Sequence, residues 1–154
     1  GLYRRGYAAT EEPDEEYILP FGKGRIISQG DQLTIITWGA MVQRSIEAVQ
    51  SLALENGIVE IIDLRTLNPI DIDLIRSSIE KTSKVLVVHE DNLTNGPGAE
   101  ISALIADKYF ELLDGPVRRV AAKDSPVPFN WLLEEKVLPQ TEDIVSAIEE
   151  LLEY

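Results

Sequence analysis

The order of apolar segments is the feature that most restricts the fold of this chain. From residue 32 onward, short β-branched runs alternate with longer segments of helical periodicity. The predicted strands cover residues 32–39, 58–64, 84–90 and 116–122, and the predicted helices cover residues 40–57, 68–82, 101–112 and 141–152. Such alternation implies parallel strands joined by right-handed crossovers, with helices on both faces of the sheet.

One further strand is predicted before this alternation begins. Residues 24–30 form a short apolar run that Arg25 and Ser28 interrupt, so we expect a half-exposed strand. Gly30 and Asp31 are typical of a tight turn, which predicts a hairpin with the strand 32–39. The first strand would then run antiparallel at the edge. The chain is thus predicted to be an α/β protein, a three-layer α/β/α sandwich with a five-strand, mostly parallel sheet and one antiparallel edge strand.

The segments outside this pattern contain proline. Residues 8–20 are acidic and carry two prolines, which predicts an extended, solvated segment. We therefore divide the chain into a linker with an acidic extended segment at residues 1–23 and an α/β domain at residues 24–154. Residues 123–140 contain three prolines and are predicted to be irregular.

Charge and cysteine content exclude several classes of function. The net charge is −13, which repels phosphate backbones and disfavours binding to nucleic acid or to an anionic membrane. The excess acid either favours a basic protein partner or only keeps the surface soluble. No cysteine is present, so disulfides, thiolate nucleophiles and cysteine zinc sites are excluded, in agreement with a cytoplasmic protein. The chain begins with Gly-Leu-Tyr and not with Met, so we expect a piece of a longer protein with no signal peptide.

The only histidine, His89, lies at the end of a predicted strand and is followed by Glu90. Ligands of open α/β sheets bind outside the carboxyl ends of the parallel strands, where loops after Trp38, Asp63, His89 and Ala122 would gather. His89 could act there as an acid–base group with Glu90 orienting it. Adjacent residues of a strand point to opposite faces, so the two pair only if the strand has ended. We favour a structural histidine whose hydrogen bonds are satisfied, and we assign no catalytic residue.

The loop at residues 94–100, "TNGPGAE", could present N–H groups to an anion at a helix N-terminus. It lacks the GxGxxG spacing and a P-loop lysine, and the neighbouring acids would repel phosphate. The glycines are expected instead to turn the chain sharply into the helix. Asp71 and Asp73 have metal-like spacing without the rest of a calcium loop, and they suit a helix start. We therefore predict no cofactor-binding or metal-binding residue.

The order of the longer motifs resembles one family. "LYRRGY", "LPFGKGRI", "IDLRTLNPID", "VLVVHEDNLTNGPGAEI" and "PVRRVAAKDSPVPF" follow one another in its register. The chain is similar to the C-terminal, transketolase-like domain of the beta chain in the thiamine-diphosphate-dependent decarboxylase component of 2-oxo acid dehydrogenase complexes. The resemblance implies an α/β/α sandwich and covers essentially the whole chain.

The resemblance also implies a function. The whole enzyme decarboxylates a 2-oxo acid, pyruvate or a branched-chain analogue, with thiamine diphosphate and magnesium, and passes the acyl group to the acyltransferase core. The cofactor sites lie in other parts of that enzyme, so this domain is expected to be inactive alone. It would build the homodimer contact of the beta chain, contact the alpha chain or domain, and help to dock the basic subunit-binding domain of the acyltransferase.

By resemblance, Asp114 and the carboxylate of Tyr154 are the candidate docking residues, and the nearby Arg118 and Arg119 would repel a basic partner. His89 and Glu90 are candidate interdomain contacts. The acidic residues at the end of the last helix are disfavoured by the helix dipole, so that end would either fray or be stabilised by a cationic partner. Two alternatives stay open: a stand-alone α/β enzyme that uses a His89 crevice, and the matching domain of a related transketolase or synthase. "LPFGKGRI" argues against the second.

Overall fold

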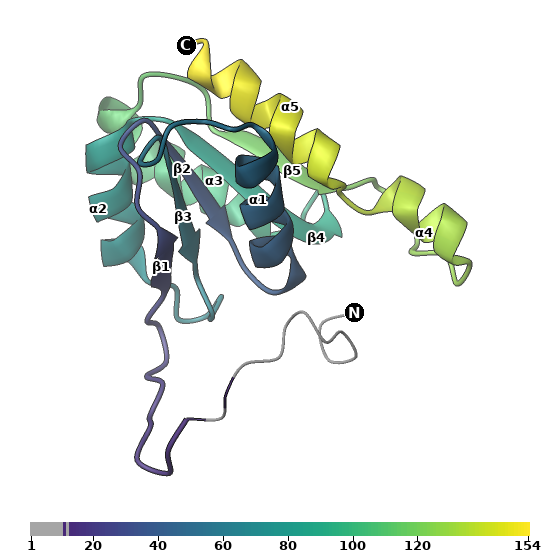
Figure 1. Cartoon of the computed structure of the whole chain (residues 1–154), viewed down its shortest axis with the longest axis horizontal. Coiled ribbons are helices and arrows are strands. Elements are labelled where there is room, and N and C mark those ends of the chain that lie inside the picture. The colour runs from purple at the N-terminus through teal and green to yellow at the C-terminus, as the bar shows by residue number, and fades with distance from the viewer. Residues whose placement is uncertain (1–10, 12) are drawn as a thin grey trace.

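The computed structural model describes residue 11 and residues 13–154 (Figure 1). The motif "LYRRGY" and much of the predicted linker therefore lie outside the described residues. Residues 13–24 contain neither helix nor strand, are largely exposed, and extend away from the folded domain. The folded part begins with the first strand at Arg25. None of the helices in the described part of the chain is long and apolar enough to cross a membrane.

A five-stranded sheet forms the middle layer, with the strands in the order β1-β3-β2-β4-β5. Strands β2, β3, β4 and β5 are parallel, and β1 runs antiparallel to β3 at one edge. The strands are β1 (Arg25–Ser28), β2 (Leu33–Thr37), β3 (Val59–Asp63), β4 (Val85–Asn92) and β5 (Arg118–Ala122). The predicted sheet, mostly parallel with one antiparallel edge strand, is confirmed.

The predicted hairpin between the first two strands is wrong, because β1 pairs with β3 and not with β2. The chain crosses the start of β3 between them, where the Asp31 N–H donates to the carbonyl of Gly57 at 2.9 Å. Gly30 is buried at this crossing, and a Cβ there would lie 2.2 Å from the backbone of Val59. Gly30 thus permits a close backbone approach and does not form a hairpin turn.

Helices cover both faces of the sheet (Figure 1). Helices α1 and α5 pack on one face, against side chains such as Ile35, and α2 and α3 pack on the other, against side chains such as Ile36. Successive residues of β2 thus serve opposite cores, and all five are buried, as expected of a central parallel strand. The helices are α1 (Ala40–Ser51), α2 (Ile72–Thr82), α3 (Pro97–Lys108), the short 3₁₀ turn η3 (Phe110–Leu112), α4 (Trp131–Val137) and α5 (Thr141–Leu152). The three-layer sandwich is confirmed.

Residues 123–140 are not wholly irregular as predicted, because they contain the short helix α4. The Asn130 side chain caps it by accepting a hydrogen bond from the Leu132 N–H at 2.9 Å. The three prolines lie before and after the helix and leave its interior free. Figure 1 shows α4 standing away from the sheet, next to the start of α5. Helix α5 is capped by Gln140 and Asp143.

Candidate functional site

The carboxyl ends of the four parallel strands gather at one edge, but they do not build the single crevice expected there. Strand β4 continues three residues past His89 and ends at Asn92. Glu90 lines a hollow of about 640 Å³ with Ala40 at the start of α1. Asn92 lines a separate hollow of about 550 Å³ with Asp124 and Ser125. Some of the expected polar groups are therefore divided between two hollows, and His89 lines neither of them.

His89 lies inside the domain and has no exposed surface. Its ring stacks on that of Trp38, with 5.4 Å between centroids and 8° between planes. Helix α3 closes over the other side, because a Cβ on Gly98 would lie 2.2 Å from His89 Nε2. Glu90, the next residue of the strand, is exposed. The two side chains thus point to opposite faces and do not form an acid–base pair.

The surroundings of His89 favour its neutral form. Burial lowers its pKa, and Arg119 adds to this lowering, whereas Asp91 opposes it. Neither ring nitrogen has a hydrogen-bond partner among the described residues, so the expectation of a hydrogen-bonded histidine is wrong. Stacking and packing hold the ring. The interdomain contact predicted for His89 and Glu90 stays a prediction; the His89 ring is buried within this domain, whereas Glu90 is exposed.

The glycines of the loop before α3 serve close packing. Gly96 has φ −73° and is not in the left-handed region, whereas Asn95, the residue before it, has φ 60°. A Cβ on Gly96 would lie 2.1 Å from the carbonyl oxygen of Asn92 and 2.9 Å from the His89 ring. Asn95 makes the sharp turn that was expected of the glycines. The His89 ring therefore occupies the space that a side chain at Gly96 or Gly98 would need.

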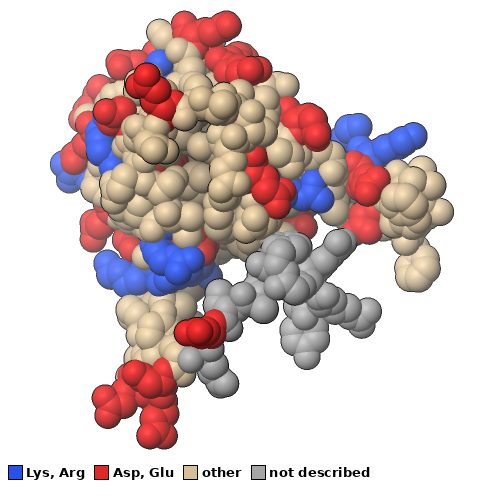
Figure 2. Space-filling model, in the orientation of Figure 1, with Lys and Arg blue, Asp and Glu red and all other residues tan. Residues whose placement is uncertain are grey.

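The two predicted docking residues lie side by side. Asp114 is exposed after η3, and its N–H donates to the carbonyl of Ser83 at 2.9 Å. The Tyr154 ring lies over the next residue, Gly115, and is 61% exposed. Figure 2 shows acidic side chains gathered over this end of the molecule, where α5 ends. Residues 40 positions apart in the sequence thus form one acidic surface, which we call the C-terminal acidic face.

The two arginines that follow Asp114 are engaged elsewhere. Arg118 forms an ion pair with Glu150 on α5. Arg119 donates a hydrogen bond to the carbonyl of Leu93 at 2.6 Å, beyond the carboxyl end of β4. Their expected repulsion of a basic partner at Asp114 is therefore reduced, since one arginine is paired with an acid and the other contacts a different loop.

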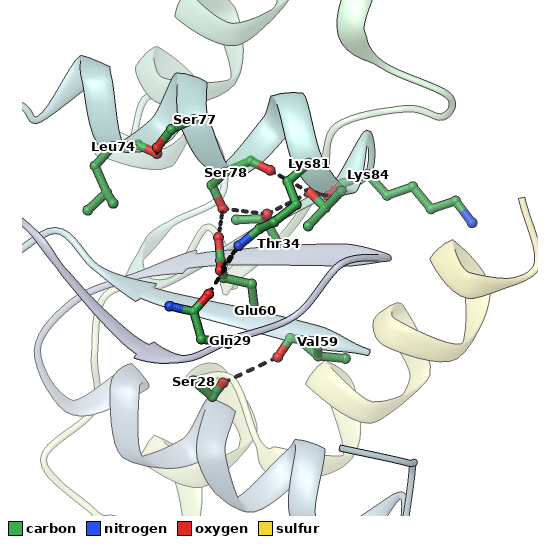
Figure 3. Close-up of polar contacts among 11 residues, drawn as sticks. Ser28, Gln29, Thr34, Val59, Glu60, Leu74, Ser77, Ser78, Lys81 and Lys84 are labelled. Atoms are coloured by element: carbon green, nitrogen blue, oxygen red, sulfur yellow. Dashed lines mark hydrogen bonds and ion pairs between the residues drawn. The ribbon is translucent and has the colours of Figure 1, made fainter. Parts of the chain in front are cut away.

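A buried polar cluster between β3 and α2 was not predicted from the sequence (Figure 3). The Glu60 carboxylate is only 1% exposed, and it accepts hydrogen bonds from Ser78 and Lys81. Thr34 on β2 contacts the hydroxyls of Ser78 and Thr82, each at 2.7 Å. The one acidic residue inside an apolar strand was the available signal. The cluster joins α2 to the beginnings of the strands, opposite the edge where ligands bind, so we interpret it as structural.

The predicted helix-start role of Asp71 is confirmed. Asp71 caps α2 by accepting a hydrogen bond from the Leu74 N–H at 3.2 Å. Its second oxygen accepts from the Gly24 N–H at 3.0 Å and so ties the start of the domain to α2. Within residues 13–154 there is no group of three or more histidine or acidic side chains that could hold a metal ion.

Comparisons of the sequence and of the structure with known proteins point to the same family. Residues 22–144 match the model of the transketolase C-terminal domain. The chain is 40% identical to the pyruvate dehydrogenase E1 component subunit beta of Staphylococcus epidermidis over 144 residues, and 41% identical to that of Staphylococcus aureus. Each match covers 94% of this chain and 44% of the relative, so the chain spans less than half the length of these relatives. One solved structure, a split-gene transketolase described as an inactive beta4 tetramer, superposes with a TM-score of 0.77 at 25% identity, covering 94% of this chain and 46% of that one.

Proposed function

This chain belongs to the transketolase C-terminal domain family, and on that premise we propose that it is the C-terminal domain of the beta chain of a 2-oxo acid dehydrogenase decarboxylase component. The observation that carries the proposal is the identity of 40–41% to pyruvate dehydrogenase E1 beta subunits over 94% of the chain. Pyruvate is the substrate in the names of these relatives, and we propose it for the whole enzyme. The structural likeness to a transketolase is lower in identity, so a transketolase domain is the less favoured reading.

We propose that this domain serves assembly and does not carry the chemistry. The intact enzyme would use thiamine diphosphate and magnesium, and the residues described here do not fit that group. The His89 ring packs against the glycines of the loop before α3, and acidic residues flank that loop and oppose a diphosphate. The stand-alone enzyme that would use His89 is not favoured, because that ring is fully buried.

The proposed partners are a second beta chain, the alpha chain or domain, and the acyltransferase. A structural relative is described as a beta4 tetramer, which supports self-assembly of this kind of chain. We propose that the C-terminal acidic face, with Asp114 and Tyr154, contacts the basic subunit-binding domain of the acyltransferase. The exposure of both residues and the pairing of Arg118 with Glu150 support this placement.

Calorimetric titration of the chain with thiamine diphosphate and magnesium tests the absence of a cofactor site. No heat of binding is expected, and stoichiometric binding would overturn the assembly role as the sole function. Sequencing the parent gene upstream of Leu2 tests the identity. A pyrimidine-binding domain is expected there, and an unrelated domain would contradict the proposal.

Docking is tested by titration with a basic acyltransferase subunit-binding domain at low and high salt. Binding should weaken as salt rises, because exposed charges are screened within about 8 Å at physiological ionic strength. Asp114→Asn should weaken it at low salt, whereas the matched variant Asp107→Asn on α3 should not. Equal binding by both variants would remove Asp114 from the contact.

A further inference from the structure

His89 is an ionisable group that is buried without a polar partner. None of its surface is exposed, and neither ring nitrogen has a hydrogen-bond partner in the part of the chain that the structure describes. Buried polar groups are nearly always hydrogen-bonded, because an unmet donor or acceptor costs free energy. A neutral imidazole carries one N–H donor and one acceptor nitrogen, so the packing around this ring offsets the cost of burying both.

Two covers enclose the ring, and they differ in how firmly they are held. On one side lies Trp38, which follows the central strand β2, and β2 is paired with a parallel strand on each side. On the other side lie Gly96 and Gly98, at the start of α3. Helix α3 has no side-chain cap, and residues 93–95 before it are exposed. The start of α3 is therefore the weaker cover.

The contacts of this weaker cover limit how far it can open. Residues 93–95 are tied to the neighbouring loop by exposed hydrogen bonds, in which Asp124 accepts from the Thr94 N–H at 2.9 Å and from its hydroxyl at 2.6 Å. Further along α3, Ile101 and Ile105 are buried in the core. Exposed hydrogen bonds break locally at lower cost than buried apolar contacts, so an opening is confined to the loop and the first turn of α3.

The surroundings of the ring oppose its protonation. Burial lowers the pKa of His89, and Arg119 on β5 lowers it further, whereas Asp91 on its own strand raises it. The first turn of α3 adds the positive end of a helix dipole next to the ring, and the charged residue of that turn, Glu100, is exposed. Trp38, on the remaining side, carries no charge. A proton on the ring is therefore disfavoured while both covers are closed.

We propose that protonation of His89 releases the loop at residues 93–96 and the first turn of α3 from β4. Above about pH 6.5, the ordinary histidine pKa, the ring is neutral in the closed and the open arrangement, and the closed one prevails. As the pH falls below that value, the open arrangement binds a proton that the closed one does not bind. The equilibrium then shifts toward opening.

The opening changes a surface at the carboxyl edge of the sheet. A hollow of about 450 Å³ lies between the first turns of α3 and the loop after β3, and its lining includes Pro97, Ile101, Leu67 and Ile70. Release of the first turn of α3 moves one wall of this largely apolar hollow, so its shape depends on pH. The inference goes beyond the assembly role and requires no partner or cofactor.

Amide hydrogen exchange of the whole chain at pH 7.5 and pH 5.5 tests the inference. The N–H groups of Leu93, Thr94 and Ala99 are hydrogen-bonded in the closed arrangement and report on its opening. After correction for intrinsic exchange rates, their opening constants should rise about tenfold at pH 5.5, the gain expected when only the open arrangement binds the proton. The rise should not depend on urea at low concentration, because a local opening exposes little surface. The Asp114 N–H, hydrogen-bonded in a distant exposed loop, is the control and should not change under the same conditions.

Two results would overturn the local opening. One is an opening constant that is the same at both pH values. The other is exchange of the three reporters only with the urea dependence of global unfolding, which would limit His89 to an effect on overall stability.

A variant and a direct titration identify the titrating group. His89→Gln cannot take up the proton and should abolish the rise, and a rise that persists in this variant would exclude His89 as the cause. The titration uses the wild type and so does not depend on the folding of a variant. His89 is the only histidine of the chain, so its ring gives a single, unambiguous set of NMR signals. Its pKa should lie below 6.5, and a pKa at or above 6.5 would contradict the inference, because protonation would then favour the closed arrangement.

Discussion

Replacing Gly98 with alanine tests whether α3 depends on the position of the His89 ring. The new methyl group would lie 2.2 Å from His89 Nε2 and 2.3 Å from Cδ2, closer than any real contact, and the ring is already stacked on Trp38. Overpacking of a filled core costs about 1–3 kcal/mol, while alanine in place of glycine in a helix returns up to about 1 kcal/mol. The net loss of unfolding free energy should be on the order of 1–2 kcal/mol.

Urea unfolding followed by circular dichroism measures this loss, and a double mutant identifies its cause. His89→Ala removes the ring and should destabilise the domain by about 3 kcal/mol because it leaves a cavity. With the ring removed, the methyl group on residue 98 fills part of that cavity. The double mutant should therefore be more stable than the sum of the two single effects predicts, by about 1 kcal/mol or more.

The control is Gly115→Ala, where the new methyl group would meet Tyr154 at an ordinary 3.5 Å and where stability should change by less than about 0.5 kcal/mol. A Gly98→Ala variant at least as stable as the wild type would refute the argument. Strict additivity in the double mutant would also refute it, because it would mean that the methyl group and the ring do not meet.

Three further predictions concern stability. Burial lowers the pKa of His89 in the folded domain, so near and below the ordinary histidine pKa of 6.5 the unfolded state binds more protons than the folded state. The unfolding free energy of the wild type should therefore fall as the pH drops from 7.5 to 5.5, and that of His89→Gln should fall by less. Urea unfolding at both pH values measures the two changes. Glu60→Ala leaves Lys81 and the buried Ser78 hydroxyl without their acceptor, so it should lower the unfolding free energy by about 3 kcal/mol in urea unfolding. Glu60→Gln keeps an acceptor oxygen and should lower it clearly less. Equal losses in the two variants would contradict a role for the acceptor. Asp71→Ala removes the cap of α2 and should lower the unfolding free energy by about 1–2 kcal/mol. The exposed Asp73 lies two residues away, and Asp73→Ala should change the unfolding free energy little in the same urea assay.

The errors of sequence-based prediction here have identifiable causes. Gly30 and Asp31 look like a hairpin turn, yet the chain crosses the start of β3, and nothing within residues 24–39 indicates which strand will be the neighbour. Proline density in residues 123–140 suggested irregular backbone, but the prolines only bracket α4. The apolar run before His89 located a strand without showing that it would continue to Asn92.

Local sequence determined the elements, the class of fold and the family. The spacing of apolar residues along a segment shows which of its side chains are buried, and that spacing predicted a five-strand α/β/α sandwich. The order of the sequence motifs indicated the family. Tertiary structure alone decided that the His89 ring fills the space in front of two glycines, that Glu60 is buried with Lys81, and that Asp114 lies beside Tyr154. These are contacts between segments far apart in the chain, and a local pattern carries no information about which distant segment will pack against it.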